Sequence, residues 1–120
     1  MITDILNKPL KLDIEGNCYN LEFDNKAYGM LEQEISKGIF QIYDAVIEST
    51  LNLEQYISIA TCGLLKHHKE QEIKEIKSKL EQKPYLVIQN IPSICGAYLA
   101  PLTPPEIMQQ ALKKEGSKKK

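Results

Sequence analysis

Two short runs of alternating apolar and polar residues near the start of the chain constrain its fold most strongly. They span residues 10–14 and 18–23 and flank Gly16 and Asn17. With these two residues at the centre of a tight turn, the large apolar side chains of both runs share one face of an antiparallel ribbon. The predicted cross-strand pairs are Ile14 with Tyr19, Leu12 with Leu21, and Leu10 with Phe23. Because glycine adopts the positive φ of such a turn without steric cost, we predict a β-hairpin over residues 10–23.

An isolated hairpin is barely stable in water, so other parts of the chain must cover its apolar face. The remaining segments have helical periodicity, and 120 residues of which 42% are hydrophobic suffice for one domain with one core. The predicted fold is α+β and mostly α, with the N-terminal hairpin packed on a bundle of about five short helices. We expect a single small domain over residues 1–114, with helices in residues 24–114, and a disordered basic tail over residues 115–120.

Capping residues and apolar stripes predict where each helix begins and ends. The helices are expected at residues 25–37, 39–48, 53–66, 70–82 and 85–99, followed by a short helix from Glu106 to Lys113. Pro92 should kink the fifth of these helices or split it into two pieces. Gly63 lies inside the third, where it costs about 1 kcal/mol relative to alanine, so we expect a neighbouring backbone to approach it closely.

The charged residues do not favour a nucleic-acid or phosphate site. The net charge is −1, all 15 basic residues are lysine, and the sequence has no arginine, the residue that clamps phosphate and guanine with two hydrogen bonds. The terminal lysines, Lys118 to Lys120, would bind an acidic partner only weakly and in a salt-sensitive way. We therefore expect a solubilising tail.

The cysteines and the N-terminus indicate a reducing compartment. Cys18, Cys62 and Cys95 are odd in number and far apart, a spacing that builds neither a disulfide framework nor a metal site. We expect free, largely buried thiols. The N-terminus lacks a basic segment before an uninterrupted apolar run, so we expect no signal peptide, and no stretch reaches the ~20 apolar residues that cross a bilayer.

The polar residues predict no catalytic or metal site. The adjacent His67 and His68 point about 100° apart on a helix, and no further ligands lie at metal-binding spacing. Apolar surroundings should keep Cys62 and Cys95 protonated. The acidic clusters, Glu32 with Glu34 and Glu70 with Glu72 and Glu75, lie on polar helix faces. We expect no enzyme activity, no cofactor and no small-molecule substrate.

The segment from Pro84 to Leu102 holds more apolar residues than one amphipathic helix needs, and almost no charge. It is therefore either the central helix of the core, which we favour, or in part a docking surface for a partner or a second copy of the chain. The candidate partner-binding residues are Tyr85, Ile88, Ile91 and Tyr98.

Four stretches follow one another along the chain. They are Leu21-Glu22-Phe23-Asp24 leading to Leu31-Glu32, then Gly38-Ile39-Phe40, then Leu53-Glu54-Gln55-Tyr56, then Cys62-Gly63-Leu64-Leu65-Lys66-His67. The order of a strand pair, a helix entered through a Phe-Asp junction, and a helix ending in small-Gly-Leu before basic residues resembles the small tail assembly chaperones of long-tailed bacteriophages and prophages. The similarity covers residues 10 to 82.

The resemblance implies a non-enzymatic chaperone in the bacterial host cytoplasm. Its expected partners are the tape measure protein and the tail tube protein, and a homo-oligomer is compatible with the family. The family carries no catalytic residues to transfer. Many of its genes contain a ribosomal frameshift site near the end, and the codons of Lys118 to Lys120 can form one.

Two other classes of protein stay open. One is a structural subunit of the phage tail or connector. The other is a small DNA-binding regulator with a helix-turn-helix between Asp24 and Lys66. Its recognition helix would start near Leu53 and present Glu54 and Gln55 first, which is a poor surface for phosphate.

Overall fold

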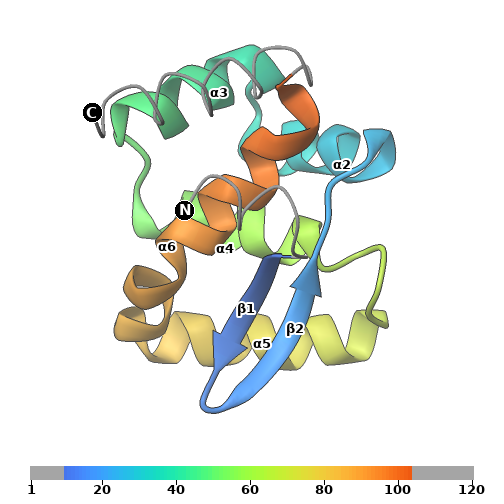
Figure 1. Cartoon of the computed structure of the whole chain (residues 1–120), viewed down its shortest axis with the longest axis vertical. Coiled ribbons are helices and arrows are strands. Elements are labelled where there is room, and N and C mark those ends of the chain that lie inside the picture. Colours follow the sequence, from blue (N-terminus) through green and yellow to red (C-terminus); the bar gives the residue numbers. More distant parts are fainter. Residues whose placement is uncertain (1–9, 104–120) are drawn as a thin grey trace, which may run out of the picture.

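The computed structural model describes residues 10–103, which form a two-stranded antiparallel hairpin packed on five α-helices (Figure 1). The elements are β1 (Leu10–Ile14), β2 (Asn17–Leu21), α2 (Asn25–Ile35), α3 (Ile39–Glu48), α4 (Leu53–Gly63), α5 (Glu70–Gln82), α6 (Pro84–Leu99) and the 3-10 turn η1 (Ala100–Leu102). The predicted class, α+β and mostly α, is confirmed. The predicted helix from Glu106 to Lys113 and the predicted tail over residues 115–120 lie outside the described residues.

The hairpin turn lies one residue earlier than predicted. Its central residues are Glu15 and Gly16, with φ of 52° and 90°, as in a type I′ turn, which favours glycine at its second central position. The carboxylate of Asp13 supports the turn by accepting the N–H of Gly16 (3.2 Å). The observed pairs are Leu10 with Leu21, Leu12 with Tyr19, and Ile14 with Asn17.

The predicted pairing is therefore wrong by two residues, but the predicted faces are confirmed. Side chains alternate between faces with a period of two, so a shift of two positions returns each one to the same face. Leu12, Ile14 and Leu21 are buried against the helices, and Lys11 and Glu22 are exposed on the opposite face.

On each edge of the hairpin, one outward-facing residue bonds to a side chain from outside the hairpin. In an antiparallel pair, alternate residues direct their backbone N–H and C=O away from the partner strand. On the β1 edge, the buried side chain of Asn90 in α6 accepts the N–H of Asp13 (2.8 Å), donates to its carbonyl (2.8 Å), and donates to the carbonyl of Leu86 (2.7 Å). On the β2 edge, the N–H of Asn20 donates to Nε2 of His68 (3.1 Å). At Asp13 and Asn20, a side chain thus takes the place that a neighbouring strand would fill.

The central helix of the fold is α4, and not the segment from Pro84 to Leu102 that we favoured. Every residue from Tyr56 to Leu64 is buried, because α2, α5, α6 and the hairpin all pack on α4. Asn52 caps the helix by accepting the N–H of Gln55 (2.8 Å), and Gln55 accepts the N–H of Asn52 (3.1 Å), as the capping pattern predicts. Beyond its exposed first residues, Leu53 and Glu54, α4 is covered by other elements, which leaves little of this helix to enter the major groove of DNA as a helix-turn-helix requires.

α4 ends at Gly63, three residues earlier than predicted. The chain directly after β2 contacts this end of the helix. The N–H of Glu22 donates to the carbonyl of Gly63 (2.9 Å). A Cβ on Gly63 would lie 3.0 Å from Cε1 of Phe23 and 3.2 Å from Cδ2 of Leu21. The predicted close approach to Gly63 is confirmed, and it involves two side chains as well as a backbone.

α6 runs without interruption through Pro92, so of the two predicted outcomes, a kink or a split, the split does not occur. Proline removes one hydrogen bond from the helix interior. Burial of the inner face compensates for this loss, since Val87, Ile94 and Ala97 on both sides of Pro92 are packed in the core.

We expect Gly63→Ala to lower the free energy of unfolding by about 1–2 kcal/mol, because the added methyl group would lie too close to the buried side chains of Phe23 and Leu21, which would have to shift. Gly29→Ala in α2 is the matched control. A Cβ there meets no atom within 4 Å, so the better helix propensity of alanine should raise stability by up to about 1 kcal/mol. Urea denaturation measures both, and equal effects of the two substitutions would contradict this account.

We expect Asn90→Ala to lower the free energy of unfolding by about 2–4 kcal/mol, because it removes both partners of the Asp13 backbone. Gln89→Ala is the control, since the exposed Gln89 makes only a long contact of 3.5 Å with the same carbonyl. Thermal or urea unfolding that cannot distinguish Asn90→Ala from Gln89→Ala would show that the amide does not secure the hairpin.

Candidate partner-binding surface

The outer face of α6 is apolar and uncharged. Tyr85 and Ile88 are 56% and 59% exposed, Pro92 is exposed one turn further on, and Ile91 is half-buried beside them. These four residues, spaced at helical intervals, form a continuous surface that we call the α6 stripe. No charged residue occurs anywhere between Pro84 and Leu99. A contiguous apolar surface of this kind is typical of a protein-binding site, whereas scattered apolar residues are not.

The sequence of α6 explains why one helix supplies both core and surface. Its inner face buries Leu86, Val87, Ile94 and Ala97 against the hairpin and α4, and the α6 stripe lies on the outer face. A helix that is apolar on both faces normally has neighbours on both. The prediction that this segment has apolar residues in excess of its core role therefore agrees with the exposure of Tyr85 and Ile88.

Tyr98 is fully buried, so its prediction as a partner-binding residue is wrong. Its hydroxyl donates to the carbonyl of Ile39 (2.7 Å), and the hydroxyl of Tyr28 donates to the carbonyl of Tyr98 (2.7 Å). The rings of Phe23 and Tyr28 pack edge-on against its ring at 5.6 and 5.5 Å. Burial raises the pKa of both tyrosines because it disfavours the phenolate. Tyr98 thus connects α2, α3 and α6 inside the core.

A second exposed apolar surface lies on α3, which the sequence analysis did not identify. Phe40 and Ile47 are 80% and 58% exposed, and Tyr43 between them is half-buried. Seven of the ten residues of α3 are apolar. Phe40 and Ile47 share an apolar arc with the buried Ile42 and Val46, and an arc this wide extends beyond what the body of the fold covers. The high apolar content of so short a helix is the feature of the sequence that could have predicted this exposed surface.

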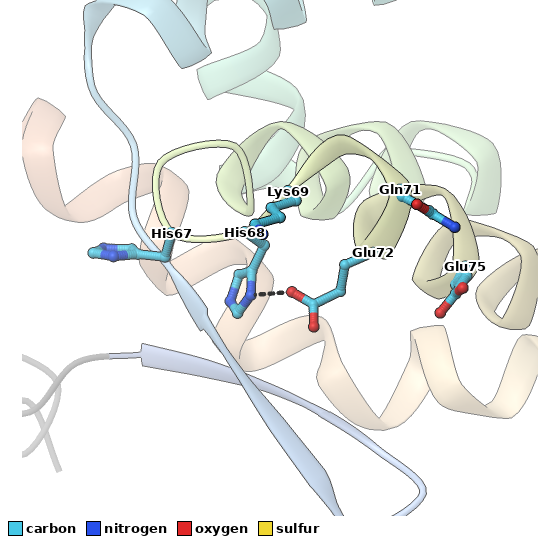
Figure 2. A pocket seen from close by; sticks show the side chains of 6 residues that line it. All are labelled: His67, His68, Lys69, Gln71, Glu72 and Glu75. Carbon is cyan, nitrogen blue, oxygen red and sulfur yellow. Dashed lines mark hydrogen bonds and ion pairs between the residues drawn. The ribbon is translucent and has the colours of Figure 1, made fainter.

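A polar, open hollow with a volume of about 490 Å³ lies beside the start of α5 (Figure 2). The Nδ1–H of His68 donates to Oε1 of Glu72 (2.6 Å), while its Nε2 accepts the N–H of Asn20. His67 and His68 lie in the turn between α4 and α5 and not on a helix as predicted, and their rings point apart (Figure 2). Nε2 of His67 lies 2.8 Å from Oε1 of Glu22. Among residues 10–103, no group of three or more histidine, cysteine or acidic side chains is placed to hold a metal ion.

The cysteines differ in exposure. Burial, together with the neighbouring Glu34 at 3.7 Å, raises the pKa of Cys62 to about 12, and burial also raises the pKa of Cys95. Both remain thiols near neutral pH and are weak nucleophiles. Cys18 is exposed on the outward face of β2, so the expectation of largely buried thiols is wrong for this residue.

The acidic clusters have separate structural contacts. Glu32 accepts the N–H of Ile39 (3.0 Å) and so caps α3. Glu34 accepts hydrogen bonds from Ser58 and Cys62 of α4. Glu70 forms a surface ion pair with Lys74 (3.5 Å).

No helix within the described part of the chain is long and apolar enough to cross a bilayer.

We expect Cys18 to react first when the folded protein meets a neutral thiol reagent near pH 8, and Cys62 to react only on unfolding. Cys18 is exposed, whereas Cys62 is buried and has a raised pKa, and these differences predict this order. Peptide mapping of the labelled protein checks it, with Cys18→Ser as the control that should abolish the fast phase. Rapid native labelling at Cys62 would show that α4 is not the closed centre described above.

Comparisons with protein-family models, with curated proteins and with solved structures gave no match to this chain. The α6 stripe and the resemblance carried by residues 10 to 82 therefore supply the basis for a functional proposal.

Proposed function

We propose that this protein is a non-enzymatic chaperone of phage tail assembly, which binds the tape measure protein through the α6 stripe in the cytoplasm of the bacterial host. The observation that carries the proposal is the uncharged outer face of α6, where Tyr85 and Ile88 are each more than half exposed. The order of sequence stretches that resembles tail assembly chaperones supports the choice of partner.

The α6 stripe suits the apolar side of a helix. Burial of apolar surface contributes about 25 cal/mol per Å², and the aromatic ring of Tyr85 supplies a large contact area with a hydroxyl that can stay at the wet rim. Ile88 lies one turn away on the same face. A long helical client with exposed apolar stripes would be kept from aggregating while such contacts cover it.

Release of the client requires no chemical step. Binding is an equilibrium, so tail tube subunits that cover the same client surface more extensively would displace the chaperone by competition. This mechanism uses no reactive side chain of the chaperone.

The body of the fold holds the α6 stripe in place before a partner arrives. Asn90 attaches the opposite side of α6 to β1, and Tyr98 attaches its C-terminal end to α3. A surface that is already ordered loses little conformational entropy on binding, which favours affinity.

We expect Tyr85→Asp and Ile88→Asp each to weaken binding of the tape measure protein by about tenfold or more, because each removes an apolar contact and buries a charge. The measurement is the soluble fraction of the tape measure protein when it is co-expressed with each variant. Gln71→Asp, an exposed substitution of the same charge on α5, is the control and should leave the client as soluble as the unaltered chaperone does.

A client that is no more soluble with the protein than without it would overturn the proposal. Recovery of the protein from purified virions in stoichiometric amount would instead support a structural tail or connector subunit, since a chaperone should be absent from finished particles.

A further inference from the structure

We propose that residues 106–113 of this chain dock as a short amphipathic helix on the outer arc of α3, which consists of Phe40, Tyr43 and Ile47. This inference concerns a different face from the α6 stripe and is independent of the proposed function.

The apolar arc of α3 is wider than the surface that covers it. Ile42 and Val46 are buried against the body of the fold. Tyr43 is half-buried and Phe40 and Ile47 are mostly exposed, so the adjoining half of the same arc has no cover among residues 10–103. A helix with such a wide apolar arc usually has a second neighbour.

The described chain ends beside the start of this arc. The hydroxyl of Tyr98 donates to the carbonyl of Ile39, the first residue of α3, which brings the end of α6 against the beginning of α3 (Figure 1). Thr103 follows closely and donates through its hydroxyl to the carbonyl of Leu99 (3.0 Å). The described part of the chain therefore ends near the N-terminal end of α3, and the sequence continues with residues 104–120.

The following segment matches the arc in length and pattern. As a helix, residues 106–113 would extend ~12 Å, and the arc from Phe40 to Ile47 extends ~10.5 Å. The apolar residues of the segment share one helical face, and the glutamines lie on the other. The apolar set is Ile107, Met108, Ala111 and Leu112.

Charge fixes the direction in which the segment would lie. α3 contains acidic residues and no basic one, with Glu48 at its C-terminal end and Lys37 just before its start. A segment that runs in the same direction as α3 brings Glu106 towards Lys37, and Lys113 towards Glu48 and the negative end of the α3 dipole. The opposite direction would bring like charges together.

A second copy of the chain fits this arc less well. A stable dimer buries about 800 Å² on each partner, which is more than one face of a ten-residue helix offers. The tethered segment needs no such area, because its attachment at Thr103 keeps it at high local concentration.

Hydrogen–deuterium exchange of the full-length protein tests the proposal. The double variant Ile107→Lys with Leu112→Lys should make the amides of residues 39–48 exchange about tenfold faster, because α3 loses its cover. Gln109→Lys with Gln110→Lys adds the same charge to the opposite face and should leave α3 unchanged. Exchange in α4 serves as the internal reference for an intact fold.

The reciprocal variant provides a second test. Ile47→Asp in α3 should make residues 106–113 exchange faster in the same protein. Equal exchange of α3 in both lysine variants would overturn the proposal. So would protection of α3 that disappears on dilution, which indicates a second copy, or protection that appears only with the tape measure protein, which indicates the client. Neither result bears on the Tyr85 and Ile88 co-expression experiment.

Discussion

A sheet of two strands has two edges with unpaired backbone groups. This structure depends on how the backbone groups at the β1 edge find hydrogen-bond partners in α6. Asn90 bonds both backbone groups of Asp13, 77 positions away in sequence, and also holds a carbonyl of its own helix. An unpaired backbone group in a partly buried place costs about 1–3 kcal/mol, so this amide makes the hairpin and α6 depend on each other. Through that attachment the hairpin covers α4, and α6 has a fixed orientation in which one face is core and the other is surface.

A second set of contacts orders the other end of the molecule. The hydroxyl groups of Tyr28 and Tyr98 each donate to a carbonyl on a different helix, and Phe23 packs against both rings. Asn90 lies near the middle of α6, and Tyr98 lies at its C-terminal end. Between them they explain how a helix that contains Pro92 and no charged side chain remains a rigid support for exposed apolar residues. Function, as we propose it, requires only that this support does not change when a partner binds.

Local patterns predicted the hairpin faces, most helix boundaries and the tight contact at Gly63, because these depend on period, caps and backbone sterics. The same patterns failed where a helix is apolar on more than one side. Periodicity shows that Ile39 and Phe40 belong to an apolar arc, but only the packing shows which of them faces water. For that reason Tyr98 was predicted on the surface although it is buried. The apolar excess that leaves Tyr85 and Ile88 exposed was visible in the sequence, because no charged residue interrupts their helix. The roles of Asn90 and His68 join residues far apart in sequence, so no local pattern reveals them.

The bond from Asn20 to His68 has a consequence for how this protein behaves at high concentration. Unpaired strand edges act as templates on which other chains, including unfolded ones, can add further strands. The sheet that residues 10–103 form has two strands, so both of its strands are edge strands. Here Asn90 and His68 occupy positions along both rims of the hairpin, so its neighbours meet helices and not a growing sheet. Contact with other molecules is thereby directed to side chains, which bind reversibly, and kept away from β-polymerisation, which does not reverse.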